Sequence, residues 1–227
     1  PNNIIMEDEN GAASVMVRIP KLTFKDLGIS DSDAVHPAFI INGKEVDEIY
    51  FSKYPNAVID GNAVSVPDVD PAASIRIDDA FELCAKKGKG WHMMTRAEYA
   101  LLSQICVRNG FLPWGNNMNG KDYREGTCTA KRSNATGHTA TGTGPASWYH
   151  DNTFAGIADL NGNTSDWVSG VRLFYGEIQI IPDNDAADTN NKEDETSECW
   201  MAINGKTGEL VKPVGLGETP DALKLDF

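Results

Sequence analysis

The sequence predicts an α+β domain, in which two helices pack on small twisted antiparallel sheets. Three observations support this class. Residues 14–24 alternate apolar and other side chains with the two-residue period of a strand. Asn42-Gly43 is a strong hairpin turn between two apolar runs. Residues 77–90 and 95–110 carry the capping and spacing signals of two amphipathic helices.

The strand expected at residues 14–24 contains Pro20, which has no backbone N–H group to donate to a neighbour. This predicts an edge strand or a strand end. The polar residues 25–34 are expected to form a link. Further strands are expected on either side of Asn42-Gly43, about Gly170 or Gly176, and on either side of residues 204–208.

The first helix is expected to have Asp78 as its N-cap and to end before Gly88. The second helix begins at a capping box formed by Thr95 and Glu98, in which each side chain accepts the backbone N–H of the other residue. Gly110 follows the last apolar position and predicts the end of this helix.

The charge of the chain limits its partners. It contains 33 acidic and 20 basic residues, which give a formal net charge of −13. Because phosphate binding needs a basic face, this composition argues against a nucleic-acid partner. No apolar run approaches the about 20 residues of a membrane-spanning helix, so we expect no membrane insertion.

The four cysteines are Cys84, Cys106, Cys128 and Cys199. None of them stands in a C-x-x-C pair, which argues against a zinc knuckle, and their number is too low for a disulfide scaffold. Their disulfide state stays open. Cys84 and Cys106 fall on the apolar stripes of the two expected helices, where a small buried side chain is the simpler interpretation.

Residues 111–154 are mostly small and polar, with aromatic side chains spaced through them. A segment of this composition buries little surface by itself, and it is too long for a bare loop unless it is functional or well held. Trp148 and Tyr149 are our candidates for an exposed ligand-binding surface. The acidic residues 182–198 predict an exposed loop.

Four motifs follow one another along the chain: DAFELC at 79–84, TRAEYA at 95–100, PWG at 113–115 and GIADLNGNTSDW at 156–167. Their order resembles that of the formylglycine-generating-enzyme-like (sulfatase-modifying-factor) domain, a variant of the C-type lectin fold. The resemblance covers about residues 39–170. It implies a C-type-lectin-like domain at 35–227, after an N-terminal strand and linker at 1–34. Trp114 and Trp167 lie in these motifs and are expected in the core.

Within this family, "HPAFIING" at 36–43 and "GIADLNGN" at 156–163 resemble the variable proteins of diversity-generating retroelements. This resemblance implies a ligand- or receptor-binding display protein of a phage tail or a bacterial surface. Its partner would be a cell-surface protein or a glycan. Assembly into a homo-oligomer is compatible with that role, and a cytoplasmic location stays open.

Two alternative functions are an enzyme of the formylglycine-generating type and a purely structural module of a tail fibre. The enzymes use a pair of cysteines late in the domain, whereas only Cys199 lies late here, so we expect no catalytic residues. The family normally ends with "RGGSW" and "GFR" strands, which do not occur before Phe227. We therefore expect the chain to lack its C-terminal variable part.

A calcium ion is the only cofactor considered, and the expected function does not require it. "DLNGNTSD" contains Asp159, Asn161 and Asp166, and calcium prefers such carboxylate and amide oxygens. The resemblance adds Asn116 of the "WGN" motif to this set. In the alternative interpretation the loop is a structural turn, in which Asp159 and Asn163 accept nearby backbone N–H groups.

Overall fold

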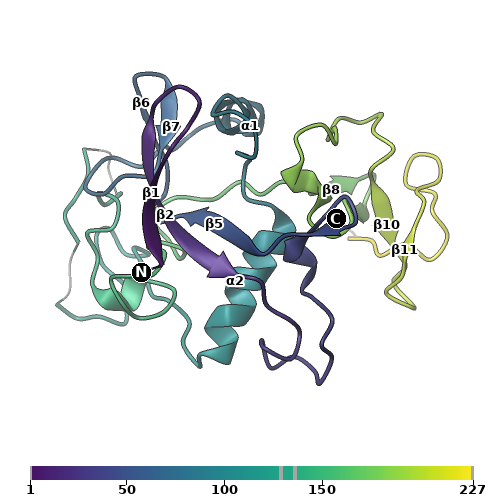
Figure 1. The fold of residues 1–227 in the computed structure, drawn as a ribbon, viewed down its shortest axis with the longest axis horizontal. Coiled ribbons are helices and arrows are strands. Elements are labelled where there is room, and N and C mark those ends of the chain that lie inside the picture. The colour runs from purple at the N-terminus through teal and green to yellow at the C-terminus, as the bar shows by residue number, and fades with distance from the viewer. Residues whose placement is uncertain (1, 128–129, 135–136, 226–227) are drawn as a thin grey trace.

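The computed structural model describes residues 2–127, 130–134 and 137–225 (Figure 1). Within these residues, two α-helices combine with several small antiparallel sheets. This confirms the predicted α+β class. Neither of the helices described is long and apolar enough to cross a membrane.

The first sheet joins β1 (Asn3–Glu7), β2 (Ala13–Pro20) and β5 (Glu48–Ser52) in the order β1-β2-β5. The prediction that β2 is an edge strand is wrong, because it pairs on both sides. The alternative of a strand end at Pro20 is confirmed, since Pro20 is the last residue of β2. Because Pro20 ends the strand, its lack of an N–H group costs no hydrogen bond in the middle of the β2–β5 pairing.

Two short hairpins accompany the first sheet, one before β5 in the chain and one after it. Strands β3 (Ile40–Ile41) and β4 (Lys44–Glu45) meet at Asn42 and Gly43, whose φ angles of 50° and 70° are those of a hairpin turn. The turn prediction is therefore confirmed, but the predicted partner strand is wrong: the apolar residues after Val46 form β5, which pairs with β2 instead of β3. The chain then leaves β4 and continues as β5. Strands β6 (Ala57–Ile59) and β7 (Asn62–Val64) form the second hairpin.

The helices are α1 (Ile77–Ala85) and α2 (Arg96–Arg108). Both bonds of the predicted capping box of α2 are present. The predicted cap of α1 is wrong: the helix starts after Arg76, and Asp78 lies in its first turn, 3.5 Å from the Arg76 guanidinium. An acidic residue there still opposes the positive end of the helix dipole.

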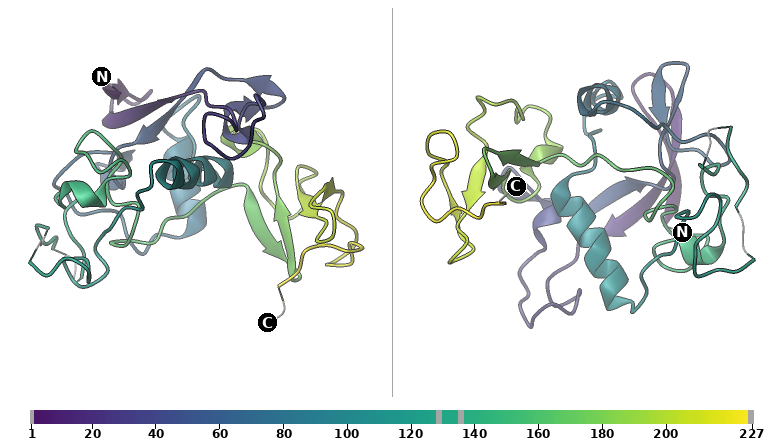
Figure 2. Two further views of the ribbon diagram at one scale, coloured as in Figure 1. Left: turned by 90° about the horizontal axis from the view of Figure 1, so that it is seen from below. Right: turned by 180° about the vertical axis from the view of Figure 1, so that it is seen from behind.

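The main core lies between α2 and the β1-β2-β5 sheet (Figures 1 and 2). Its buried members are Val17, Ile19, Leu27, Ala38, Phe39, Ile49, Phe51, Ala97, Leu101, Leu102 and Ile157. Three of these residues precede residue 35. Residues 1–34, which we expected to be a separate strand and linker, therefore contribute to the same core as the rest of the domain, because β2 and Leu27 close it on one side.

A second sheet lies beside this body, at the yellow-green end of the chain (Figure 2). It consists of β8 (Val171–Phe174), β9 (Glu177–Ile180), β10 (Met201–Ile203) and β11 (Leu210–Val211), in the order β11-β10-β9-β8. The turn at Gly176 and the hairpin of β10 and β11 agree with the expected strands. We call residues 171–225 the C-terminal lobe.

The acidic segment 182–198 is not the fully exposed loop that its charge predicted. It contains a short 3₁₀ helix (Asp185–Ala187), and Ala186 is buried with Ile181 and Trp200 in a small core of the C-terminal lobe. Asn184 is also buried. The apolar residues hidden among the acids are few, so composition alone does not reveal this packing.

Candidate functional site

The segment that follows the PWG motif and the motif at 156–167 cross each other with their backbones in direct contact. Asn116 forms an isolated parallel bridge with Gly162, and the N–H of Asn163 donates to the carbonyl of Asn116. A Cβ atom added to Gly162 would lie 2.5 Å from the Asn116 oxygen, and one added to Gly115 would lie 1.5 Å from the Asn161 oxygen. Both glycines are therefore required by the crossing.

The two asparagines of the crossing, Asn116 and Asn163, bind the backbone of the segment that lies between the two motifs in sequence. Asn163 accepts the N–H of Thr139 and donates to its carbonyl, at 2.8 and 3.0 Å. Asn116 accepts the N–H of Gly120 and donates to the carbonyl of Gly137. Paired backbone groups of this kind keep a long segment ordered without regular secondary structure.

The residues before the crossing are bound to the first sheet. Ile157, Ala158 and Asp159 are buried, and the N–H of Ala158 donates to the carbonyl of Lys53, just after β5. Asp159 has a left-handed φ of 58°, and its Oδ2 accepts the N–H of Gly142 at 2.8 Å. Its side chain is thereby aimed into the space beside β5.

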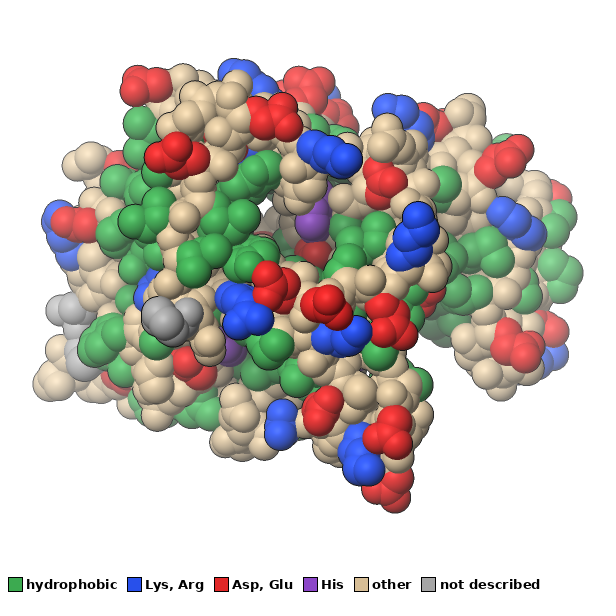
Figure 3. All heavy atoms as spheres, viewed as in Figure 1, with side chains coloured by type: hydrophobic (Ala, Val, Ile, Leu, Met, Phe, Trp, Pro, Cys, Tyr) green, Lys and Arg blue, Asp and Glu red, His purple; other side chains and the backbone are tan. Residues whose placement is uncertain are grey.

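That space is a cavity of about 780 Å³ enclosed by β5, the β6–β7 hairpin, α1 and residues 157–167. Figure 3 shows this part of the surface as a hollow bordered by hydrophobic side chains. The walls combine aromatic rings, methionines and acidic groups. Their principal side chains are Met16, Tyr50, Tyr54, Trp91, His92, Met93, Met94, Glu98, His138, Asp159, Asp166 and Trp167.

Two carboxylates of the cavity lie in an unfavourable electrostatic environment. Burial, assisted by the nearby Asp166 carboxylate and opposed by the hydrogen bond from Gly142, raises the pKa of Asp159 to about 6. Desolvation by the surrounding walls also raises the pKa of Asp166 to about 6, although this residue is exposed at the mouth, where solvent weakens that effect. Within the described residues, Asp166 has no hydrogen-bond or ion-pair partner.

A third acid of the cavity, Glu98, is in contrast fully satisfied. Its carboxylate lies 2.9 Å from Nε2 of His92, and it accepts the N–H of Thr95 and the side-chain amide of Asn184. Burial opposes the charge of Glu98, but His92 and these donors lower its pKa below the usual value. The pKa of His92 is raised, because the attraction of Glu98 exceeds the effect of burial.

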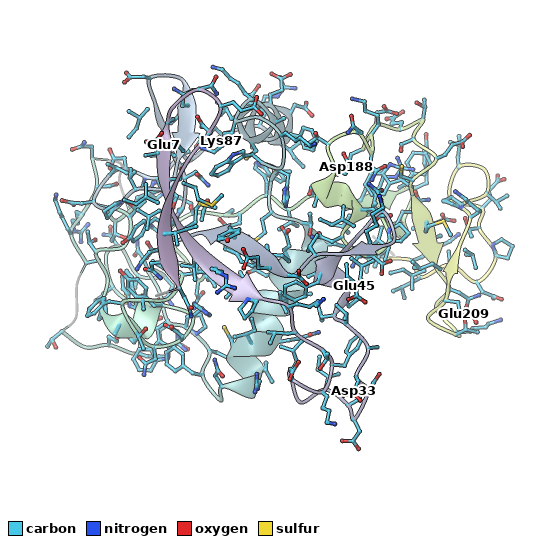
Figure 4. All side chains as sticks on the ribbon, viewed as in Figure 1. Glu7, Asp33, Glu45, Lys87, Asp188 and Glu209 are labelled. Carbon is cyan, nitrogen blue, oxygen red and sulfur yellow. The ribbon has the colours of Figure 1, made fainter. Side chains whose placement is uncertain are left out.

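The rings of Trp91 and Trp167 are held at the cavity by polar contacts. The Nζ atom of Lys87 lies 4.3 Å from the centre of the Trp91 ring, and this buried lysine also pairs with Asp8 at 3.0 Å. Figure 4 places Lys87 between α1 and the β6–β7 hairpin. The Trp167 indole N–H donates to the carbonyl of Ile75 at 2.9 Å. The protein therefore presents both indoles in defined positions.

The prediction that Trp167 lies in the core is wrong, since 49% of its surface is exposed at the cavity. Trp114 is half-buried, and the guanidinium of Arg124 stacks 4.7 Å from its ring centre. The last aromatic residue of the family motif therefore lies outside the main core, whereas Ile157 of the same motif is one of its buried members.

The prediction of a binding surface at Trp148 and Tyr149 is also wrong. Both are buried, Trp148 completely. The Trp148 indole donates to Glu125, and the Tyr149 hydroxyl donates to the carbonyl of Gly142. Both side chains anchor the long segment to the protein, since a segment rich in small residues needs such aromatic anchors to bury surface.

The four residues predicted to bind calcium do not form one shell in this structure. Asp159 and Asp166 face the cavity, whereas the amides of Asn116 and Asn161 donate to backbone carbonyls. In addition, no group of three or more His, Cys, Asp or Glu side chains is arranged for a metal among the residues described. The arrangement therefore fits the structural turn better than a calcium shell. Calcium binding stays a prediction.

Three of the cysteines can be placed, whereas Cys128 lies outside the described residues. Cys84, Cys106 and Cys199 are free thiols. Cys106 is buried on α2 as expected, and Cys84 is half-buried at the cavity. Burial raises the pKa of both of these helical thiols, so their environment opposes the thiolate form.

Sequence reasoning missed Tyr54, Trp91 and Gly142. Gly142 has a φ of 65°, and an added Cβ would lie 2.3 Å from the Tyr54 ring. Its N–H also holds Asp159. No local pattern marks these residues, because they meet only where segments about 90 residues apart along the chain are brought together.

The comparison with known protein families agrees with this arrangement. The model of the sulfatase-modifying factor enzyme 1-like domain (FGE-sulfatase) matches residues 12–174, which is more than half of the chain. The match includes β2, both helices, the crossing motifs and every side chain named above as a cavity wall. No curated protein matches the chain. The chain thus belongs to the FGE-sulfatase family.

Proposed function

We propose that this protein is a ligand-binding module, that its ligand occupies the cavity beside β5, and that it catalyses no reaction. The cavity carries this proposal. Its volume of about 780 Å³ falls within the range of roughly 300–1,000 Å³ that is typical of ligand sites. Apolar walls with a few convergent polar groups are also typical of such sites, and here Asp159 and Asp166 supply those groups.

The thiols support binding rather than thiol chemistry. Formylglycine-type catalysis needs reactive thiolates, whereas burial raises the pKa of Cys84 and Cys106. Cys199 belongs to the C-terminal lobe, where it packs against the small core of Ile181, Ala186 and Trp200. None of these thiols is paired with another described cysteine.

The proposal extends to the biological setting. The resemblance of residues 36–43 and 156–163 to variable proteins supports a display protein with a C-type lectin fold, encoded beside a diversity-generating retroelement. Its location would be a phage tail or a bacterial surface, and its partner a cell-surface protein or a glycan. The strongly negative net charge supports a partner other than nucleic acid.

The test is to fill the cavity and to measure binding. Ala73 is an exposed alanine at the cavity wall, so Ala73→Trp places a large ring in the opening without disturbing the core. Ala155→Trp, at an exposed alanine outside the cavity walls, is the matched control. We expect the unmodified protein to bind bacterial cells or a glycan array saturably. Ala73→Trp should weaken this binding at least about tenfold, and Ala155→Trp should not change it.

Two outcomes would contradict the proposal. Saturable binding that survives Ala73→Trp would place the binding surface elsewhere on the molecule. The absence of saturable binding to any cell or glycan would favour a purely structural module. Circular dichroism of both variants controls for misfolding.

A further inference from the structure

We propose that the ligand carries a positively charged group on an apolar stem, as a lysine side chain does, and that this group lies between Asp159, Asp166 and the indole rings. The inference deepens the function proposed above and rests on the cavity being the binding site. It follows from the charges that face the cavity, from their missing partners and from the nature of the walls.

The charge balance of the cavity is negative. Among the described residues that line it there is no lysine or arginine, whereas three carboxylates face it. Glu98 is satisfied by His92, Thr95 and Asn184. Asp159 and Asp166 therefore provide the negative charge that remains, and the net charge of −13 reinforces it at longer range.

The oxygens of these two aspartates are available to a ligand. Asp159 is 4% exposed, and only its Oδ2 is engaged, by the N–H of Gly142. Its Oδ1 and both oxygens of Asp166 have no partner among the residues described. A buried carboxylate without a cation, such as Asp159, is unfavourable, and a cationic ligand would remove that penalty by supplying the missing charge and N–H donors. Asp166 is exposed and offers its charge at the mouth of the cavity.

The walls favour an organic cation over a metal ion. Trp91 and Trp167 present indole rings, and the faces of such rings attract cations. The Lys87 ammonium occupies one face of Trp91, 4.3 Å from its ring centre, so Trp167, which is 49% exposed, is the more open of the two rings. Met16, Met93 and Met94 add polarisable apolar surface that suits an alkyl stem. A metal ion would use neither feature.

The experiment compares two probes that differ in the charged group. Nα-acetyl-lysine methylamide and the neutral Nα-acetyl-norleucine methylamide are titrated into the full chain, with tryptophan fluorescence and NMR as readouts. The lysine compound should bind saturably and at least about tenfold more tightly than the norleucine compound. Nζ-trimethyl-lysine should also bind, because indole faces accept a quaternary ammonium.

The variants connect this preference to the two aspartates. Asp159→Asn and Asp166→Asn should each reduce the preference for the lysine compound to about threefold or less. Asp183→Asn is the matched control. Asp183 is also a partly buried aspartate with a raised pKa, but it lies outside the cavity walls. This control should keep the full preference.

The outcomes separate this inference from the proposed function. If both compounds bind equally and Ala73→Trp blocks both, the cavity binds neutral ligands, so the function stands and the inference fails. If neither compound binds up to its solubility limit, while Ala73→Trp still abolishes binding to cells, the inference again fails and the proposed function stands. If calcium chloride displaces the lysine compound and binds more tightly than it, the aspartates form a metal site and the inference is overturned.

Discussion

Asp159 combines three properties that are unfavourable for a folded protein. It is buried, it has a left-handed backbone conformation, and its pKa is raised to about 6. Desolvation is the largest cause of the raised pKa, and only the N–H of Gly142 donates to the carboxylate. Groups held in such environments are typical of binding and catalytic sites, where function outweighs stability.

We expect Asp159→Asn to raise the free energy of unfolding at pH 7.5 by about 1–3 kcal/mol. Asparagine removes the desolvated charge, keeps an acceptor for the N–H of Gly142 and tolerates a left-handed φ. In the unfolded chain the carboxyl has an ordinary pKa of about 3.9, so the native state binds the proton more tightly. The stability of the unmodified protein therefore rises as pH falls through 6 towards 4, and the gain from Asn shrinks.

Urea denaturation at pH 7.5 and pH 5, with a chelator present, measures this difference. Asp188→Asn is a control of opposite sign, because hydrogen bonds from Asn190 and Asn42 lower the pKa of Asp188. That variant should lose stability at pH 7.5. An Asp159→Asn variant no more stable than the unmodified protein at pH 7.5 would show that the carboxylate is compensated in the native state.

At the scale of elements, the long segment between α2 and β8 is organised by close contacts rather than by regular structure. Gly115 and Gly162 let two backbones cross, and Gly142 seats the ring of Tyr54. The buried ring of Trp148 anchors the segment, and its indole N–H donates to Glu125 of the same segment. The cavity wall thus depends on positions where only glycine fits, because each is a close approach that a Cβ atom would prevent.

We expect Gly142→Ala to destabilise the protein by about 2–4 kcal/mol, because it adds strain at a φ of 65° and drives the Tyr54 ring away. Gly110→Ala has the same φ of 65° with no atom within 4 Å, so it should lose only about 1 kcal/mol. Thermal denaturation compares the two. Equal losses would mean that the ring adapts and that Gly142 does not position it. Ligand binding should fall only in Gly142→Ala.

At the scale of the whole molecule, Asn184 joins the C-terminal lobe to the main body. Its buried side chain accepts the hydroxyl of Thr95 and donates to the carbonyl of Ala38 and to Glu98. The backbone N–H of Asn184 also donates to the carbonyl of Ile40. The capping box of α2 therefore serves two purposes: it starts the helix, and it supplies the lobe with one donor, the Thr95 hydroxyl, and one acceptor, the Glu98 carboxylate.

We expect Asn184→Ala to lower the free energy of unfolding by about 2–4 kcal/mol, since it leaves buried groups of the main body without partners. Asn190→Ala removes only the exposed side-chain bond to Asp188, keeps the backbone one, and should change the free energy of unfolding by less than about 0.5 kcal/mol. Urea denaturation measures both. Hydrogen exchange of β8–β11 should accelerate selectively in Asn184→Ala. Unchanged protection there would mean that the lobe is held by other contacts.

Local signals predicted several elements because their causes are local. The capping box of Thr95 and Glu98 and the turn at Asn42-Gly43 involve neighbours in the chain, and both are present. Pairing partners were less predictable. Nothing near Pro20 reveals that β2 has strands on both sides, because β5 lies about 30 residues away in sequence.

The sequence by itself determined the α+β class, the family motifs and the helix that carries the capping box, since each depends on spacing along the chain. Only the tertiary structure decided which aromatic and acidic side chains face the cavity. Trp148 is buried and Trp167 is exposed, and each indole donates to a residue distant in sequence, Glu125 and Ile75. Exposure is a property of the packed chain, so composition could name these tryptophans but not assign their roles.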